Sequence, residues 1–253
     1  NTLFVPFTKF ESIITYCVFF GISSNDILKY TDIKNKVYHL HMDILEKDKY
    51  VIYEGLISKD MAKIAEQYLL FQMLNFRNIE EGTKHGNVPG AHCRYVDSLM
   101  ESLLLHVQPK IEKKIGVSLI PVFSYCRVYL PGTILEDHVD SSRAEYSATL
   151  TLGWKYIDKP DDFRWSLHVE TPNIPKRYLV CEPGDAVIYK GMEIAHGRDR
   201  FNLAEGSYHA QVHFHYMDAN GPYADTTILT DVNRIHKYDG RPGIGFDFPR
   251  FKK

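Results

Sequence analysis

The chain has 253 residues, and 44% of them are hydrophobic, which is enough for one sizeable folded core. Lys and Arg total 30 and Asp and Glu total 32, so the chain lacks the positive excess that draws proteins to nucleic acid or anionic membranes. This balance favours a small-molecule substrate over nucleic acid or a membrane as the partner, and it leaves the oligomeric state open.

The four cysteines are widely separated and form no C-x-x-C pair, which disfavours a disulfide framework or a cysteine zinc site. We therefore expect a reducing, cytoplasmic location. The apolar stretch IITYCVFFGI (13–22) is too short to span a bilayer and predicts a core helix.

In chain order, the first structural signal after that stretch is a short strand in DKYVIYEGLI (48–57). A helix is predicted over 58–76, with Ser58 as N-cap and an apolar series at helical spacing: Met61, Ile64, Ala65, Tyr68, Leu69 and Met73. A second helix is predicted over 95–116, ending at Gly116, with Pro109 as a point where it can kink. Residues 1–117 thus form a mainly helical portion with a leading strand.

After residue 120 the pattern shortens to runs rich in Val, Ile, Tyr, Phe and Thr, separated by turns such as LPGT and EPGDA. The runs cover 119–130, 146–154, 165–171, 177–182, 185–191 and 208–217. Such spacing predicts an antiparallel sandwich or barrel over 118–222. Residues 223–253 predict a coil-rich extension, and we expect the three portions to form one structural domain.

Residues 135–152, LEDHVDSSRAEYSATLTL, place His138 and Asp140 two positions apart just before a predicted strand. Because side chains alternate along an extended segment, both groups can reach one ion from the same face. In GDAVIYKGMEIAHGRDRF (184–201), His196 follows an apolar strand and a turn. Two histidines and a carboxylate are the facial set that leaves positions of iron(II) open. The sequence therefore predicts His138, Asp140 and His196 as metal ligands and catalytic residues.

Two other histidine groups are alternatives to this site. YHLHMD (38–43) aligns His39, His41 and Asp43 on one strand face, but no pocket is indicated around them. HAQVHFHY (209–216) aligns four polar side chains on one face, of which one or two are expected to line the pocket and the rest to be hydrogen-bonded within the sheet: His209, Gln211, His213 and His215.

The combined motifs resemble the iron(II)- and 2-oxoglutarate-dependent dioxygenases, specifically the prolyl-4-hydroxylase-like branch. The resemblance covers roughly residues 48–222 and rests on YVIYEGLISKDMAKIAEQ (50–67), YCRVYLPGTILEDHVD (125–140) and EPGDAVIYKGMEIAHGR (182–198). It implies a mainly β fold with α, the double-stranded β-helix (a jelly roll, cupin-like), with N-terminal helices packed on one sheet. It also implies Fe(2+), 2-oxoglutarate and O2 as cofactor and co-substrates.

The family's co-substrate anchor is not plainly present. The resemblance leads us to expect Lys or Arg on the last core strand, but that segment reads EGSYHAQVH (205–213). Arg198 is the favoured substitute because an Arg fork matches a carboxylate and because it lies two residues from His196. Arg200 and His209 are the next candidates, with Arg127 also nearby. Tyr129 matches the position from which the family often supplies a hydroxyl to the co-substrate.

The implied reaction is hydroxylation of an unactivated C–H bond, with succinate and CO2 as co-products. Related halogenases lack the carboxylate ligand, so Asp140 argues against halogenation. Arg143 and Glu145 could bind a free amino acid or derivative, while Trp165 and His168 are weaker substrate candidates. Asp218 and Asn220 belong to the same weaker group.

Three alternatives stay open at this point. A cupin-like isomerase or hydrolase would use the same metal ligands without 2-oxoglutarate. A peptidyl or protein hydroxylase of the same superfamily would differ only in its substrate. A noncatalytic jelly-roll binding protein would keep His138 and Asp140 as structural residues.

Overall fold

The computed structural model describes residues 45–76, 88, 90–141 and 144–224. The helix predicted over 13–22, the group His39, His41 and Asp43, and Arg143 lie outside the described residues, as does all but the start of the predicted C-terminal extension.

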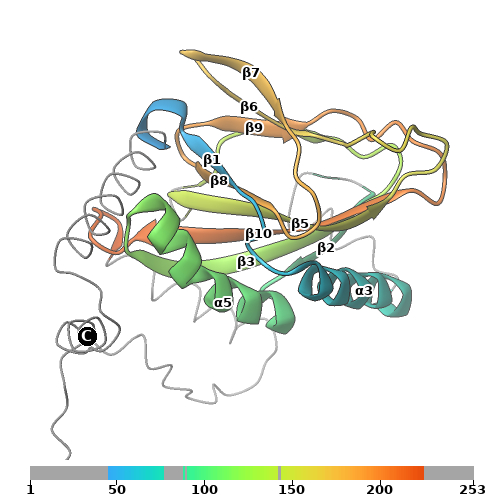
Figure 1. Cartoon of the computed structure of the whole chain (residues 1–253), viewed down its shortest axis with the longest axis horizontal. Coiled ribbons are helices and arrows are strands. Elements are labelled where there is room, and N and C mark those ends of the chain that lie inside the picture. The colour runs from blue at the N-terminus through green and yellow to red at the C-terminus, as the bar shows by residue number, and fades with distance from the viewer. Residues whose placement is uncertain (1–44, 77–87, 89, 142–143, 225–253) are drawn as a thin grey trace, which may run out of the picture.

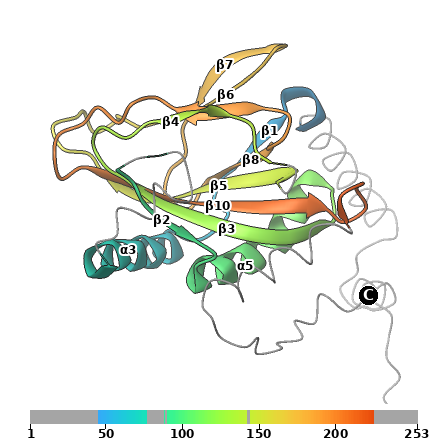
Figure 2. The same cartoon turned by 180° about the vertical axis from the view of Figure 1, so that it is seen from behind.

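The described residues contain two antiparallel sheets that lie as separate layers (Figure 1). The larger has the order β1 (Tyr50–Tyr53), β8 (Ala186–Lys190), β5 (Tyr146–Lys155), β10 (Tyr208–Asp218), β3 (Leu119–Tyr129), β2 (His92–Tyr95). The smaller has the order β4 (Leu135–His138), β9 (Ala195–Arg198), β6 (Leu167–Thr171), β7 (Ile174–Leu179). Figure 2 shows β4, β6 and β7 in the layer facing β5, β10 and β3. This is the predicted double-stranded β-helix.

Two helices cover the outer face of the larger sheet, α3 (Lys59–Phe76) against β5 and α5 (Ser98–Ile115) against β3. The predicted N-cap of α3 is confirmed, since Ser58 Oγ accepts a hydrogen bond from the Met61 amide at 3.2 Å. Helix α5 ends as predicted, with Gly116 in the left-handed conformation at φ 77°.

The predicted start of α5 at residue 95 was wrong. Asp97 caps the helix by accepting from the Leu99 amide at 3.0 Å, so the helix begins at Ser98. The residues before the cap form β2, a strand that was not predicted, which pairs with β3 from His92↔Val128 to Tyr95↔Tyr125. Strand β7 covers 174–179 rather than 177–182, because it pairs with β6 up to Leu167↔Leu179.

The main hydrophobic core lies between these helices and the larger sheet. Helix α3 contributes Ala65 and Leu69, while α5 contributes Leu104 and Ile111. Ile64, a member of the predicted apolar series of α3, is instead 64% exposed. One helical residue is a rotation of about 100°, so Ile64 points away from the sheet while its neighbour Ala65 is buried against it.

Strand β10 divides two kinds of interior. Its apolar alternate residues, such as Val212 and Phe214, join the core beneath the helices. The other set, His209, Gln211, His213 and His215, is also buried but faces the space between the sheets. A buried face this polar is a candidate binding site, because buried polar groups normally require partners.

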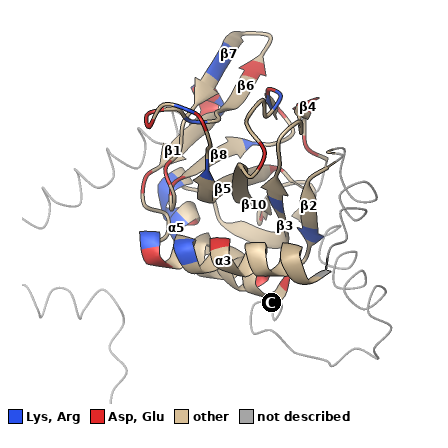
Figure 3. Ribbon diagram, turned by 90° about the vertical axis from the view of Figure 1, so that its right-hand side faces the viewer, with Lys and Arg blue, Asp and Glu red and all other residues tan. Residues whose placement is uncertain are grey.

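Charge is mixed on the side of the molecule seen in Figure 3, where lysines alternate with acidic residues along the first part of α3. None of the described helices has the length and hydropathy needed to cross a membrane.

Candidate metal centre

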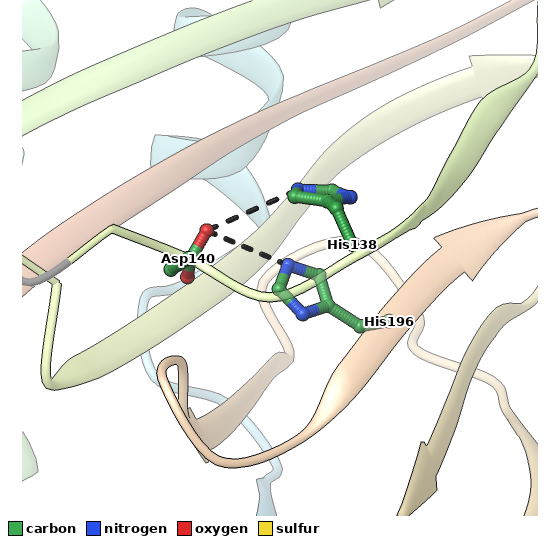
Figure 4. Close-up of side chains that lie close together, drawn as sticks. All are labelled: His138, Asp140 and His196. Atoms are coloured by element: carbon green, nitrogen blue, oxygen red, sulfur yellow. Dashed lines mark ion pairs between the residues drawn. The ribbon is translucent and has the colours of Figure 1, made fainter.

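Adjacent strands of the smaller sheet bring the two predicted histidine ligands together. His138 ends β4 and His196 lies on β9, and the two residues are paired in the register of these strands. Their ring centroids are 4.4 Å apart. Asp140 Oδ1 lies 3.9 Å from His138 Nε2 and 3.7 Å from His196 Nε2 (Figure 4). The three side chains thus offer ligand atoms that all lie within 4.8 Å of one another.

The reason that Asp140 reaches this point differs from the prediction. Strand β4 ends at His138, so Asp140 is not on the same face of one strand. Instead, the Asp140 amide donates to the carbonyl of Gly191 at 2.8 Å, which fixes the turn after β4 beside the end of β8. A Cβ at position 191 would collide with Asp140 Oδ2 and with the Ala144 carbonyl, so this approach requires glycine.

The other oxygen of Asp140 is held by the larger sheet. Ser147 Oγ on β5 donates to Asp140 Oδ2 at 2.6 Å, and the same hydroxyl lies 3.0 Å from His215 Nδ1 on β10. One carboxylate oxygen therefore faces the two histidines while the other is hydrogen-bonded. Outer contacts of this kind orient metal ligands.

Both histidines present the correct nitrogen for a metal. Nδ1 of His138 lies 2.8 Å from the Glu136 carbonyl, and Nδ1 of His196 lies 3.1 Å from the Ile194 carbonyl. A proton on each Nδ1 satisfies these contacts and leaves Nε2 with a lone pair directed at Asp140. Burial lowers the pKa of His196 to about 4, although Asp140 opposes the shift, so its imidazole is neutral at pH 7. The donor set fits a divalent metal.

The centre is open on one side. The side chain of His138 is 41% exposed, whereas that of His196 is 2% exposed. A metal held here would be reached from the His138 side while the barrel interior lies behind it.

Arg198 extends from the same face of β9 as His196, two residues further along, or about 6.6 Å. It is buried, and its Nη2 donates to Gln211 Oε1 at 2.7 Å while its Nη1 donates to the Trp165 carbonyl. The Arg198 Nε has no hydrogen-bond partner. Within the described residues Arg198 has no acidic partner, and burial lowers its pKa.

Two more of the predicted co-substrate residues lie beside Arg198. His209 lines a cavity with Arg198 and Trp165, and its Nε2 has no hydrogen-bond partner. Tyr129 stacks edge-on against Trp165, with ring centroids 4.9 Å apart, and its hydroxyl accepts from Gln211 Nε2 at 3.2 Å. Arg198, His209 and Tyr129 thus form one cluster inside the barrel.

Arg200 lies apart from that cluster. It is exposed after the end of β9, and its Nη1 donates to the Gly132 carbonyl at 2.9 Å. The strand alternation that points Arg198 inward no longer applies once β9 has ended.

Among the predicted substrate residues, Trp165 alone faces the described interior, with its ring 4.9 Å from the Arg198 guanidinium carbon. His168 pairs with Gly197 while Val169 pairs with His196, so His168 points to the opposite face of the sheet. There it contacts Asp137, which it holds together with Lys176.

Glu145 is also occupied elsewhere, because its Oε2 accepts from the Asp218 amide at 2.9 Å at the end of β10. Asp218 Oδ1 in turn accepts from the Asn220 amide at 2.8 Å, so all three close the turn after that strand.

Sequence reasoning did not identify Ser147 and Gly191 as site residues. A signal for Ser147 exists in YSATLTLGW (146–154), where Ser147, Thr149 and Thr151 are polar at every second position of an otherwise apolar strand. That period marks one face as a polar interior. Nothing local marks Gly191, whose close approach to Asp140 involves residues 51 positions apart in the chain.

Comparison with known proteins supports the fold. No protein-family model and no curated protein sequence matches the chain. Among solved structures, a Pseudomonas putida prolyl-4-hydroxylase aligns with a TM-score of 0.52 and 14% identity over 72% of this chain and 98% of its own. A non-heme alpha-ketoglutarate-dependent carbocyclase from nogalamycin biosynthesis aligns with a TM-score of 0.53 and 14% identity, over 74% of this chain and 86% of its own. A non-heme alpha-ketoglutarate-dependent epimerase, also from nogalamycin biosynthesis, aligns with a TM-score of 0.51 and 12% identity, over 79% of this chain and 89% of its own. These similarities establish the double-stranded β-helix fold.

Proposed function

We propose that the protein is an iron(II)- and 2-oxoglutarate-dependent oxygenase that hydroxylates an unactivated C–H bond of a small molecule. The observation that carries this proposal is the convergence of His138, Asp140 and His196 at the mouth of a double-stranded β-helix. Two imidazoles and one carboxylate suit iron(II) and leave open positions for further ligands.

The residues at the two ends of the cavity would have different roles. His138, Asp140 and His196 would hold the metal, which when bound supplies the oxidative chemistry that side chains lack. Ser147 would fix the Asp140 carboxylate, and Trp165 with Tyr129 would close the space around Arg198.

Arg198 would anchor the distal carboxylate of 2-oxoglutarate. Its offset of about 6.6 Å from His196 along β9 suits a dicarboxylate whose first carboxylate reaches the metal centre. A carboxylate would pair with the unmatched Nε and relieve the cost of a buried charge. His209 and the Tyr129 hydroxyl would add contacts beside it.

The proposal is tested by anaerobic titration of metal-free protein with iron(II) and then 2-oxoglutarate. The metal chelate of 2-oxoglutarate has a visible charge-transfer band, so its appearance reports both ligands at once. We expect the band in the wild type and its loss in Asp140→Ala.

Arg198→Gln should weaken 2-oxoglutarate binding about 10- to 100-fold, because a hydrogen bond to a charged group contributes about 1.5–3 kcal/mol. The matched control is Arg200→Gln, in the same segment but exposed, which should bind 2-oxoglutarate like the wild type. Iron binding without a band would contradict the 2-oxoglutarate assignment and favour a cupin-like enzyme. Failure to bind iron would contradict the metal site itself.

The outcome of the reaction is a separate question, because the structural neighbours include proteins named as an epimerase and a carbocyclase as well as a hydroxylase. Product mass decides among these. Hydroxylation adds one oxygen, carbocyclisation removes two hydrogens, and epimerisation leaves the mass unchanged.

A further inference from the structure

A second buried guanidinium, that of Arg127 on β3, faces the same interior as Arg198. Arg127 pairs with Gln211 in the register of β3 and β10, and its Nη1 donates to the Tyr129 hydroxyl at 3.3 Å. Its Nε is buried without a hydrogen-bond partner. Within the described residues no carboxylate contacts either guanidinium, and an unmatched buried charge is costly.

A buried hydroxyl beside Arg127 is also unmatched. Tyr125 lies two residues earlier on the same face of β3, and its OH has no hydrogen-bond partner. The Arg127 guanidinium carbon lies 4.6 Å from the centre of the Tyr125 ring. Buried tyrosine hydroxyls normally find partners, so two neighbouring donors point to one missing acceptor.

The sheet register places this pair toward the metal centre. Across β3, β10 and β5, one row contains Phe123, His215 and Ser147, and Ser147 contacts Asp140. The next row contains Tyr125, and the one after it contains Arg127. The guanidinium carbon of Arg127 is closer to the ring of Tyr125 (4.6 Å) than to that of Tyr129 (5.9 Å), so the side chain leans toward the metal end.

The number of carboxylates in 2-oxoglutarate distinguishes the two guanidiniums. Under the proposed function, one carboxylate of 2-oxoglutarate goes to the metal and the other to Arg198, which leaves Arg127 without an anion. Gln211 separates the two, since it accepts from Arg198 at 2.7 Å and donates to the Tyr129 hydroxyl that Arg127 also contacts. Two buried guanidiniums on opposite sides of the Gln211 amide each require an anionic partner.

We infer that Arg127 and the Tyr125 hydroxyl bind a carboxylate of the prime substrate, which is therefore a small organic acid. A planar guanidinium offers parallel donors to a carboxylate, and the tyrosine hydroxyl adds a third. Tyr125 lies one row, about 7 Å, and Arg127 two rows, about 14 Å, from the row that contains Ser147, which contacts Asp140. The oxidised carbon therefore lies a few bonds from the acid group. This inference rests on the proposed function for its account of Arg198.

The test uses propionate as the probe and propionamide as its uncharged match. Binding is measured by calorimetry in the anaerobic protein saturated with iron(II) and 2-oxoglutarate, so that the Arg198 site is already filled. We expect propionate to bind and propionamide to bind at least about tenfold more weakly. Tyr125→Phe, which removes one hydroxyl, should weaken propionate several-fold, and Arg127→Gln should abolish its binding. Both variants should keep the 2-oxoglutarate affinity of the wild type.

Three results would overturn the inference. The first is that propionate does not bind, or binds no better than propionamide. The second is that neither Tyr125→Phe nor Arg127→Gln changes propionate binding. The third is that Arg127→Gln weakens 2-oxoglutarate as much as Arg198→Gln does, which would make Arg127 part of the co-substrate anchor. If Arg127→Gln does not fold, Tyr125→Phe and Arg127→Lys carry the same comparison.

Failure of the proposed function is recognised separately. If no charge-transfer band forms with iron(II) and 2-oxoglutarate, the oxygenase assignment fails, whatever propionate does. Propionate is then titrated into the metal-free protein, where binding that depends on Arg127 and Tyr125 would still identify an acid-binding site.

Discussion

Removing the Ser147 hydroxyl should weaken metal binding without unfolding the protein. In Ser147→Ala, Asp140 Oδ2 loses its 2.6 Å hydrogen bond, and His215 Nδ1, at 3.9 Å, is too distant to replace it without moving. The carboxylate can then rotate away from the two histidines. Loss of an outer partner of a metal ligand typically costs about 10- to 100-fold in metal affinity, or about 1.4–2.7 kcal/mol.

The matched control is Ser207→Ala. Ser207 lies just before β10 and is as buried as Ser147. Its Oγ accepts a hydrogen bond from the Ile157 amide at 3.0 Å. Each variant therefore loses one buried hydroxyl contact, and each should reduce the free energy of unfolding by about 1 kcal/mol. Only Ser147→Ala should change metal affinity.

The assay is anaerobic competition for iron(II) between the protein and a colorimetric chelator, with urea unfolding of the metal-free variants alongside. Equal iron affinity in the two variants would refute the reasoning, because it would mean that Asp140 is held by the Gly191 contact alone.

Three further predictions follow from the same interior. Gly191→Ala should weaken iron binding by at least about tenfold, because its methyl would displace the Asp140 carboxylate; unchanged competition with the chelator would contradict this. His168→Gln should lower the unfolding free energy through loss of the Asp137 contact, by about 1 kcal/mol, but leave the 2-oxoglutarate charge-transfer band unchanged; loss of the band would put His168 in the site after all. The metal-free protein should lose stability as pH falls from about 6.5 toward about 4, because burial lowers the folded-state pKa values of His196, His209 and His213 and the unfolded chain then binds more protons. The free energy of unfolding should fall by about 1.4 kcal/mol per pH unit for each of these histidines. In urea titrations, His213→Gln should reduce this slope by the contribution of one histidine.

The sequence was sufficient for the features that local chemistry determines. Ser58 delimits its helix through its hydroxyl and Gly116 through its backbone amide, and alternation along β10 places His209 and Gln211 inside. The group of His138, Asp140 and His196, which the structure brings together, could be predicted because His138 and Asp140 are close in the chain and because His196 follows a recognisable strand and turn.

Features that depend on pairing between distant segments could not be predicted. Whether Arg198 or Arg200 faces inward depends on where β9 ends, and β9 is held by pairing with β4 and β6. The face chosen by His168 depends on which residue lies opposite His196. A shift of one residue would reverse both orientations, so no composition or spacing rule could decide them.

The polar interior lowers the stability of the protein when its ligands are absent. Arg127, Arg198 and His209 are buried between the sheets, each with a nitrogen that has no hydrogen-bond partner, so this layer destabilises the ligand-free protein while the apolar core beneath α3 and α5 stabilises it. A ligand that pairs with these nitrogens binds only the folded chain and should raise its melting temperature.

At a 2-oxoglutarate concentration of about 100 times its dissociation constant, mass action stabilises the folded state by about 2.7 kcal/mol. For a domain of this size that corresponds to a rise in melting temperature of about 5–10 °C. The measurement is thermal unfolding of the protein with a redox-inert divalent metal, with and without 2-oxoglutarate. In Arg198→Gln the empty protein should melt at or above the wild-type temperature, because a buried charge has gone, while the gain on adding 2-oxoglutarate should largely disappear. The Arg198 guanidinium would not be the binding site of this anion if 2-oxoglutarate left the melting temperature of the wild type unchanged. The same would follow if it raised the melting temperature of Arg198→Gln as much as that of the wild type.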